Sequence, residues 1–299
     1  TQIWGEDFDE TFSPVSQLAT VRIVFTWCII LGLIPHQADV KTAFLNSTLK
    51  FEVYIKLPKG ITILGKKFAK LLKSLYGLKQ AARDWYELQE RFILSFDKRF
   101  KKSSVDPCLY VIVDGDFIVV ISTHVDDYII ATNDSDWYKA FMAAFNTQFE
   151  VKDLGVVNHI LQMHVEWAKD GKSLSISQQR QIRALAEKYG LSDCKHVQTP
   201  MEKGLQLKPA ASPDVALPFR SLIGALLWIA RGSRPDIMYA VIYLSRFSAS
   251  YDSQHFTAAK RILRYLVTTL EKKLTFAPSA TGATPSTHQK IVLYSDSDW

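Results

Sequence analysis

Residues 117–131 constrain the fold more than any other part of the chain. Two apolar runs, FIVVI at 117–121 and YIIA at 128–131, flank the dipeptide Asp126-Asp127. Short apolar runs rich in β-branched residues are typical of buried strands, so the pattern predicts a hairpin with two carboxylates at its tip. Neighbouring strand residues point to opposite faces, so both carboxylates can serve one site only if they lie in the turn. Asp-Asp is also a common turn dipeptide, and the hairpin alone leaves its role open.

A third carboxylate, Asp39, ends a short predicted strand, and the aromatic Phe44 follows five residues later in the sequence DVKTAF. Phosphoryl transfer by a polymerase needs a set of carboxylates that hold two Mg²⁺ ions about 4 Å apart. One ion lowers the pKa of a primer 3′-hydroxyl, and the other neutralises the triphosphate and the departing pyrophosphate. We therefore predict Asp39, Asp126 and Asp127 as ligands of two Mg²⁺ ions, with Mn²⁺ as an alternative.

The charge distribution points to a nucleic-acid partner more clearly than the net charge does. Residues 41–110 carry 15 Lys and Arg against 6 Asp and Glu, a local excess of +9, whereas the whole chain has a net charge of +6. Tyr76, Trp85 and Tyr86 lie within this basic segment, which suits a surface that follows phosphates and stacks on bases. The predicted nucleic-acid contacts are Lys73, Lys79 and Arg83. A solvated, lysine-rich face explains the same charge count and remains open.

No segment has the pattern of a membrane span or a secretion signal. The longest apolar run, residues 23–34, is shorter than the roughly 18 residues that a spanning helix needs, and acidic residues precede it. Cys28, Cys108 and Cys194 lack the spacing of a disulfide framework or a zinc site. We expect an intracellular protein, in a cytoplasmic particle or the nucleus or both, with no membrane partner. Because the chain starts with Thr1 and stops after a strand-like run, we also expect it to be a fragment.

The chain is 47% hydrophobic and 22% charged over 299 residues, which predicts a large core and more than one domain. Its pattern predicts a mixed α and β protein. The predicted helices are residues 16–33, two stretches within 68–96 divided around Tyr76-Gly77, 137–149, 178–189, 220–230, 236–248 and 253–270. The predicted strands are residues 37–44, two strands within 110–132, a hairpin around 169–171 and a final strand at 290–294. Residues 199–218, with four prolines, are the predicted linker.

Eight blocks in chain order carry a family resemblance over almost the whole chain: DETFSPV (9–15), DVKTAFLNSTL (39–49), SLYGLKQAARDWY (74–86), DPCLYV (106–111), HVDDYIIAT (124–132), LSISQ (174–178), RSLIGALLWIARGSRPDI (220–237) and KRILRYL (260–266). Together they resemble the reverse transcriptase region of copia-type LTR retrotransposon polyproteins. The resemblance implies an α+β polymerase right hand. It implies partial fingers and a palm with an antiparallel sheet at residues 1–155, a primer-grip hairpin and thumb at 156–198, a linker and connection region at 199–289, and a truncated RNase H start at 290–299.

The resemblance also implies roles for single residues. Asp39 matches the first polymerase carboxylate, with the backbone carbonyl of Val40 beside it, and Asp126-Asp127 match the paired aspartates of the catalytic hairpin. Together with Lys152 they form the implied catalytic set.

Three further residues lie at positions that the family uses for the nucleotide, and each also has a plainer explanation. Phe44 matches the aromatic that floors the sugar pocket and excludes a 2′-hydroxyl, although core packing would also explain it. Gln80 matches a glutamine that lies against the incoming nucleotide, although glutamine is also common on surfaces. Lys152 stands where such polymerases often carry a lysine that protonates pyrophosphate; a salt bridge at the surface is the alternative. The hairpin at residues 160–178 resembles the primer grip.

Several positions depart from the family pattern. Asp296 resembles the first metal ligand of RNase H, but no further carboxylates of that site follow it, so we expect no competent RNase H in this chain. His124 stands where tyrosine is usual, Ala82 where proline is usual, and Ser47 and Gln162 where glycine is usual. The last two changes matter if those turns need a positive φ, which costs a residue with a Cβ on the order of 1 kcal/mol. The fingers strand that grips the triphosphate would precede Thr1.

Two functions remain open on the sequence alone. The first is an RNA-directed DNA polymerase whose partners are an RNA template, a DNA primer and deoxynucleoside triphosphates. The alternative is a truncated or decayed retroelement fragment that folds and binds nucleic acid without catalysis. The sequence leaves the oligomeric state undetermined.

Overall fold

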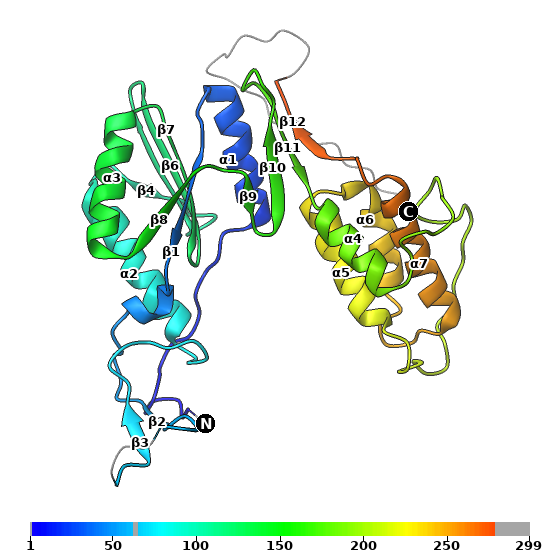
Figure 1. Cartoon of the computed structure of the whole chain (residues 1–299), viewed down its shortest axis with the longest axis horizontal. Helices are drawn as coiled ribbons and strands as arrows, with labels where there is room; N and C mark the ends of the chain where they lie inside the picture. Colours follow the sequence, from blue (N-terminus) through cyan, green and yellow to red (C-terminus); the bar gives the residue numbers. More distant parts are fainter. Residues whose placement is uncertain (1, 62–64, 279–299) are drawn as a thin grey trace.

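A computed structural model describes residues 2–61 and 65–278. The predicted final strand at 290–294 and Asp296 lie outside these residues. The described chain is a mixed α and β structure whose named sheets are all antiparallel. In Figure 1 it forms a large-sheet body and a helical bundle, with a small sheet between them.

The large sheet has six strands in the order β4-β5-β6-β7-β1-β8. Their bounds are β1 (His36–Val40), β4 (Lys101–Lys102), β5 (Leu109–Asp114), β6 (Phe117–His124), β7 (Asp127–Thr132) and β8 (Val151–Val156). The predicted hairpin is therefore β6 and β7, and β1 pairs with its outer edge. This order brings Asp39 next to the hairpin although about 90 residues separate them in the sequence, as the contact between Gln37 and Asp127 illustrates.

The two faces of the large sheet are covered by different helices. Helices α2 (Ala81–Phe96) and α3 (Ser135–Gln148) pack on one face through a core rich in aromatic side chains that includes Trp85, Phe141 and Tyr128. Helix α1 (Leu18–Leu31) packs on the other face through Val21 and Phe25. Because side chains alternate along β1 and β7, the residues between those of the aromatic core point to the α1 face.

Local signals set the end of α1 and the start of α3. Gly32 ends α1 in the left-handed region with φ 65°, a conformation that glycine adopts without strain. Asp134 caps α3 by accepting hydrogen bonds from the backbone N–H groups of Asp136 and Trp137. The helices predicted at 16–33 and 137–149 are confirmed, with ends that differ by about two residues.

The small sheet and the bundle form the second half of the described chain. The small sheet has the order β12-β11-β10-β9, and the bundle is inserted between β11 and β12. The strands are β9 (His159–Ile160), β10 (Met163–Trp167), β11 (Leu174–Ser177) and β12 (Leu274–Phe276), and the bundle comprises α4 (Gln179–Lys188), α5 (Phe219–Gly232), the 3₁₀ turn η2 (Pro235–Ile237), α6 (Met238–Ser245) and α7 (Ser253–Thr268).

One core joins α4 to the later helices. Ile182 of α4 packs in the same buried cluster as Leu226 of α5 and Leu263 of α7. This cluster extends across the position between residues 198 and 199, which is the predicted boundary between the thumb and the connection region. Residues 199–218 form no helix or strand, as predicted for a linker, yet Leu207 and Leu217 pack on the bundle.

Several elements differ from the sequence prediction: β2 (Tyr54–Lys56), β4, β8 and β12 were not predicted, and the strand predicted at 37–44 ends at Val40. Only the second of the two helical stretches predicted within 68–96 is a helix, because β3 (Phe68–Lys70) pairs instead with β2 in a small hairpin. Residues 109–132 contain three strands rather than two, because a turn with Gly115 at φ 59° separates β5 from β6. The error at residues 68–70 arises from pairing with a distant segment, and the error at residues 109–132 from a turn that divides an apolar run.

Candidate active site

The turn between β6 and β7 is the centre of the candidate site. His124 and Asp127 are cross-strand partners, so Val125 and Asp126 form a two-residue turn between them. Asp39 is the partner of Asp127 on the other side, and the backbone N–H of Val40 donates to the carbonyl of Asp126 at 2.9 Å. The structure therefore brings Asp39, Asp126 and Asp127 together at one end of the large sheet.

Four side chains form a continuous row across neighbouring strands at this end of the sheet. The row, called the carboxylate row below, comprises His124, Asp127, Asp39 and Lys152 on β6, β7, β1 and β8. The residues adjacent to it along the strands, such as Ala38 and Tyr128, are buried under α2 and α3. The row therefore lies on the opposite face, where directly opposed residues on adjacent strands are close neighbours.

The carboxylates of this row and the neighbouring Asp126 influence one another electrostatically. Burial raises the pKa of Asp39, and the neighbouring Asp126 raises it further, while Lys152 acts in the opposite direction. Burial likewise raises the pKa of Asp127, a hydrogen bond from Gln37 lowers it, and Asp126 and Asp39 raise it again. Close carboxylates that disfavour each other's ionised form are the group that a bound cation would stabilise.

Carboxylate oxygens are the donors that Mg²⁺ prefers, so the chemistry of the row fits the predicted metal. In residues 2–61 and 65–278, no group of three or more His, Cys, Asp or Glu side chains converges closely enough to hold an ion. The three aspartates thus lie close together and influence one another's pKa, but their side chains do not point at one common position.

Trp85 holds the turn from the opposite face of the sheet. It is 1% exposed, and its indole N–H donates to the carbonyl of Val125 at 2.6 Å. Val125 has φ 59°, an uncommon conformation for a β-branched residue that must be held by its surroundings. The prediction that Trp85 and Tyr86 stack on nucleic-acid bases is wrong, because both side chains are buried.

Two residues of the site were not assigned from the sequence. Gln37 donates from Nε2 to Asp127 Oδ1 at 3.0 Å, and its position two residues before Asp39 on the same strand would have indicated this. The ring of Tyr76 lies 4.5 Å from that of Phe44, between centroids. Burial raises the pKa of Tyr76, and Asp126 and Asp39 raise it further. Tyr76, which is 53% exposed, thus packs against Phe44 and lies within electrostatic range of both carboxylates.

The other predicted contact residues lie against the N-terminal segment. Gln80 is 4% exposed, donates to the carbonyl of Asp7 at 3.0 Å and accepts a hydrogen bond from Gln2 at 2.9 Å. The ammonium of Lys79 lies 4.5 Å from the centre of the Phe8 ring.

Arg83 is also committed to contacts within the chain. It forms ion pairs with Glu10 at 2.7 Å and Glu87 at 3.0 Å. Lys73 is exposed. None of the predicted contact residues Lys73, Lys79, Arg83 and Gln80 belongs to the carboxylate row.

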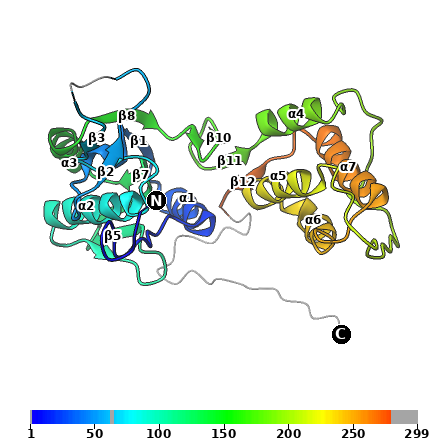
Figure 2. The same ribbon diagram turned by 90° about the horizontal axis from the view of Figure 1, so that it is seen from below.

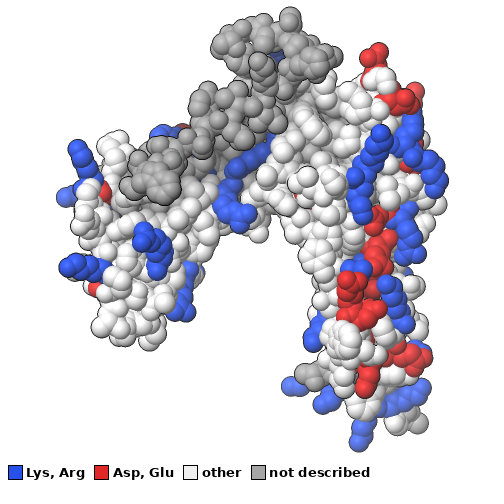
Figure 3. All heavy atoms as spheres, turned by 180° about the vertical axis from the view of Figure 1, so that it is seen from behind, with Lys and Arg blue, Asp and Glu red and all other residues white. Residues whose placement is uncertain are grey.

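Much of the basic charge of residues 41–110 is paired. Carboxylates lie within 4 Å of several of these side chains: Lys41, Lys50, Lys70, Arg83, Arg99 and Lys102. Figure 3 shows acidic and basic side chains side by side on the large-sheet body, whereas the visible face of the bundle carries mainly basic ones. The local excess of +9 therefore does not form an unbroken positive surface.

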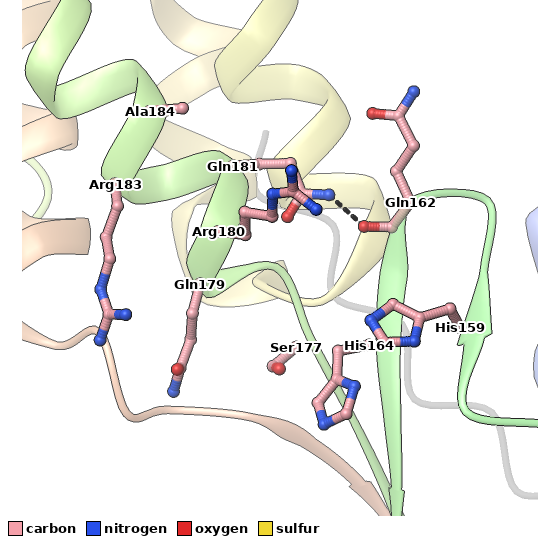
Figure 4. Close-up of a pocket in the computed structure, with 9 residues that line it drawn as sticks. All are labelled: His159, Gln162, His164, Ser177, Gln179, Arg180, Gln181, Arg183 and Ala184. Atoms are coloured by element: carbon pink, nitrogen blue, oxygen red, sulfur yellow. Dashed lines mark hydrogen bonds between the residues drawn. The ribbon is translucent and has the colours of Figure 1, made fainter.

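A cavity of about 670 Å³ lies between the small sheet and α4 and is called the grip cavity below (Figure 4). It is lined by His159, Gln162, His164, Ser177, Gln179, Arg180, Gln181, Arg183 and Ala184. Arg180 and Arg183 are exposed, and in the part of the chain that the structure describes neither forms an ion pair with a carboxylate. The grip cavity therefore offers free positive charge beside imidazole and amide groups.

The turn that leads into this cavity answers a question raised by the sequence. Leu161 and Gln162 have φ of 48° and 63°, so the turn does need the conformation that glycine would adopt freely. Ser47 has φ −84°, so serine at that position carries no such strain.

No helix in the described part of the chain is long and apolar enough to cross a membrane. A family model described as "Reverse transcriptase (RNA-dependent DNA polymerase)" matches residues 1–203. The chain is 35% identical over 287 residues to the "Retrovirus-related Pol polyprotein from transposon TNT 1-94" of Nicotiana tabacum, covering 92% of this chain and 21% of that protein. It is 34% identical over 299 residues to the polyprotein from transposon RE1 of Arabidopsis thaliana, covering 99% and 20%.

A shorter relative covers a comparable region. The "Putative transposon Ty5-1 protein YCL074W" of Saccharomyces cerevisiae is 32% identical over 235 residues, which are 77% of this chain and 75% of that protein. The chain spans about a fifth of the length of the plant polyproteins. The family match and these identities show that the chain belongs to the reverse transcriptase family, in the group carried by the Pol polyproteins of copia-type retrotransposons, and the carboxylate row agrees with this.

Proposed function

We propose that this chain copies an RNA template into DNA by adding deoxynucleotides to a primer 3′-hydroxyl, with the carboxylate row as its catalytic centre. The observation that carries the proposal is the register of Asp39 with Asp127, beside Asp126 in the turn. Two segments that lie far apart in the sequence, around Asp39 and around Asp126-Asp127, thus bring three carboxylates to one end of an antiparallel sheet. Such a set suits nucleotidyl transfer, which needs dense negative charge at a rigid position.

Asp39, Asp126 and Asp127 would hold the two Mg²⁺ ions, with the carbonyl of Val40 as an additional ligand. When bound, the ions would supply Lewis-acid chemistry, lowering the pKa of the 3′-hydroxyl and neutralising phosphate charge. The chain's own contribution is to hold the carboxylates still: the bonds from Trp85 and Val40 fix the turn, and Gln37 orients Asp127.

Lys152 is the proposed proton donor to departing pyrophosphate. It is the strand partner of Asp39 and lowers the pKa of that carboxyl, so an ammonium group is close to the site where negative charge leaves. Its amino group is exposed and therefore free to move toward a substrate. Gln80 is proposed to contact the nucleotide only after the N-terminal residues Gln2 and Asp7 release its amide.

Phe44 is the proposed floor of the sugar pocket, and its contact with Tyr76 supports this position near the carboxylates. Replacing Phe44 with Val should open space beneath C2′ and raise ribonucleotide use relative to deoxyribonucleotide use by roughly 10- to 200-fold, the range for small changes in pocket size. The control is Phe92→Val, which alters the aromatic cluster beneath α2 away from the row. Unchanged sugar discrimination in Phe44→Val would make Phe44 a packing residue only.

We also propose which parts of the chain form the fingers, palm and thumb of a polymerase right hand. Residues 1–155 would be partial fingers and palm, and the small sheet with α4 would form the primer grip and the start of the thumb. The grip cavity, with Arg180 and Arg183, supplies the charge that a duplex backbone of partly A-form shape requires. Figure 3 shows the molecule hollowed between the large-sheet body and the bundle, where a duplex would lie. Residues 199–289 would be linker and connection, and 290–299 the RNase H start.

The direct test compares a double variant, which carries both Asp126→Asn and Asp127→Asn, with the control Asp116→Asn. Both are made in a chain extended with its polyprotein flanks. Asp116 lies in the turn at the other end of β6 and is exposed, which makes it a matched aspartate outside the row. We expect primer extension on an RNA template to disappear in the double variant and to persist in the control. Extension that survives in the double variant would refute the assignment of the carboxylates.

A second measurement separates binding from catalysis. Fluorescence anisotropy with an RNA–DNA duplex across a salt series should give a log K that falls by roughly 0.7 to 0.9 per phosphate contact for each unit of log salt. The aspartate variant should bind at least as tightly as the parent, whereas Arg180→Glu with Arg183→Glu should bind more weakly and flatten the slope. Charge reversal at Lys73 and Lys79 should act in the same direction. Binding without extension by the parent itself would favour the non-catalytic alternative.

A further inference from the structure

The segment from Arg231 to Asp236, with the sequence RGSRPD, contacts three parts of the chain that are far apart in sequence. It comprises the end of α5 and the start of η2. It belongs neither to the carboxylate row nor to the grip cavity, and the roles proposed above do not use it. Its partners are α1, the connection from β11 to α4, and the connection from α7 to β12.

The first contact comes from α1, which packs on the large sheet. Arg22 donates to the carbonyl of Gly232 at 3.0 Å and also to that of Arg231. The last carbonyls of a helix lack partners within the helix and carry partial negative charge, so a cation there is stabilising. Burial lowers the pKa of Arg22, and the charge of Arg231 lowers it further. A residue of the large-sheet body thus caps a helix of the bundle.

The second contact involves Gln178, the single residue between β11 and α4. Gln178 is 1% exposed, and its Oε1 accepts a hydrogen bond from Ser233 Oγ at 2.9 Å. Gly232 leaves room for this amide, because a Cβ at that position would lie 2.2 Å from Oε1 and 2.6 Å from Cδ of Gln178. A side chain at position 232 would therefore displace the buried amide of Gln178.

The third contact secures the chain on its way back from the bundle. Arg234 is 1% exposed and donates to the carbonyl of Thr269 at 3.0 Å and to Thr269 Oγ1 at 2.6 Å, while Asp236 accepts from it at 2.8 Å. Thr269 directly follows α7, and β12 begins five residues later. The same short segment therefore grips the chain both where it enters the bundle and where it leaves.

We propose that residues 231–236 form the joint that sets the angle of the bundle relative to the large sheet, with Gly232 and Gln178 as its positioning residues. In Figures 1 and 2 the bundle lies beside the large-sheet body and approaches it near α1 and the small sheet, where this segment makes its contacts. The joint rests on contacts within this chain and does not depend on the proposed function. Its consequence for a bound duplex rests on the proposed function, because the bundle angle sets the width of the hollow.

The test uses the full 299-residue chain with Cys194→Ser and spin labels at Val113→Cys and Tyr239→Cys, two exposed positions on the large-sheet body and the bundle. Cys28 and Cys108 are buried and remain unlabelled. Electron–electron double resonance then reports the distance between the two labels in Gly232→Ala, in Gln178→Ala and in the variant with both changes. The matched control is Gly224→Ala in the same helix, where an added Cβ would meet nothing within 4 Å.

We expect Gly232→Ala to shift or broaden the distance distribution, because the methyl group displaces the buried amide. The variant with both changes should resemble Gln178→Ala alone, since the clash requires both groups. Gly224→Ala should leave the distance unchanged and raise the melting temperature. Unchanged distances in Gly232→Ala, or strictly additive effects of the two changes, would overturn the proposal.

Two further arms keep the outcomes distinct. If Gly232→Ala does not fold, Ser233→Ala and Arg22→Gln remove bonds of the joint without adding bulk, and each should shift the distance; unchanged distances in both would also overturn the joint. The affinity for an RNA–DNA duplex is measured in parallel and should fall several-fold in Gly232→Ala. A shifted distance with unchanged duplex affinity would support the joint and count against the duplex-binding role.

Discussion

Two tight turns of the molecule contain residues at positive φ but differ in how they are supported. The turn at Val125-Asp126, called the carboxylate turn below, lies at the centre of the candidate site. The turn at Leu161-Gln162, called the grip turn below, leads into the grip cavity. Each is a two-residue connection between antiparallel strands. One residue of the first turn has positive φ, Val125 at 59°, whereas both residues of the second do, Leu161 at 48° and Gln162 at 63°.

Their backbone carbonyls are held differently. The carboxylate turn is fixed from two other elements, since Trp85 of α2 donates to the carbonyl of Val125 and Val40 of β1 donates to that of Asp126. The grip turn has a bond from the side chain of Gln181 to the carbonyl of Gln162. Unfavourable backbone conformations persist where the surroundings determine them more than once, which is the condition of the carboxylate turn. Its strain is therefore tied to tertiary structure, whereas strain in the grip turn can be relieved locally.

The largest expected effect comes from removing the tertiary support of the carboxylate turn. Trp85→Phe keeps an aromatic ring in the core but leaves the carbonyl of Val125 without its donor, which should destabilise the fold by about 1–3 kcal/mol. Primer extension should fall further than duplex binding, because Asp126 in this turn and Asp127 beside it are the proposed catalytic aspartates. Chemical denaturation and single-turnover kinetics measure the two effects.

The matched control is Trp137→Phe, whose indole N–H donates to Asp97 at 3.2 Å, away from the turn. If this control lost primer extension as strongly as Trp85→Phe, the special support of the carboxylate turn would be refuted.

A second effect concerns the pH dependence of stability. The pKa of Asp127 in the folded chain is raised, chiefly by burial. The ionised carboxylate therefore costs stability, and this cost appears as the pH rises from the unfolded value of about 3.9 through the raised folded value. Asp127→Asn keeps an acceptor for Gln37 and should raise the melting temperature at pH 7 more than at pH 4. An equal rise at both pH values would show that ionisation is not the cause.

A smaller effect is expected at the grip turn, where a substitution should stabilise the fold, in contrast to Trp85→Phe. Gln162→Gly should stabilise the chain by roughly 1 kcal/mol, because glycine adopts positive φ without the Cβ penalty. Ser47→Gly is the comparison, since Ser47 has φ −84° and should gain nothing. Thermal unfolding of both variants decides the matter. A stabilised Ser47→Gly would mean that glycine acts here for a reason other than φ.

The smallest effect tests the bond that holds the grip turn. Gln181→Ala removes the donor to the Gln162 carbonyl, which is exposed enough for water to replace it, so stability should fall by about 0.5–1.5 kcal/mol or less. Denaturant unfolding beside Trp85→Phe gives the comparison directly. A loss as large as that of Trp85→Phe would remove the distinction between the two turns.

The carboxylate turn and the residue that supports it were not equally predictable from the sequence. The hairpin around Asp126-Asp127 and its neighbour Asp39 were predictable because the apolar runs define strands and the spacing defines the turn. The burial of Trp85 was not, since an aromatic residue in a basic segment fits a binding surface equally well until α2 is packed on the sheet.

Pairing between distant residues also escaped the sequence pattern. The basic excess of residues 41–110 looked like a binding surface, but Lys41 pairs with Glu150 and Arg83 with Glu10, both outside that segment. Residues 68–70 followed a helical pattern, but their partner at 54–56 made them a strand. Local pattern predicts the elements, whereas the partners that decide the exposure of Trp85 or Arg83 come from elsewhere in the chain.

Strand β12 has a consequence for the order in which the chain folds. It pairs with β11 although 100 residues separate Ser175 from Thr275, whose hydroxyl groups are 3.0 Å apart. Closing so long a loop is slow, and during synthesis on the ribosome β11 must wait until the last bundle helix has emerged. The family match ends at residue 203. A chain terminated there would leave β11 as a bare edge strand, a template for aggregation that β12 covers in the 299-residue chain.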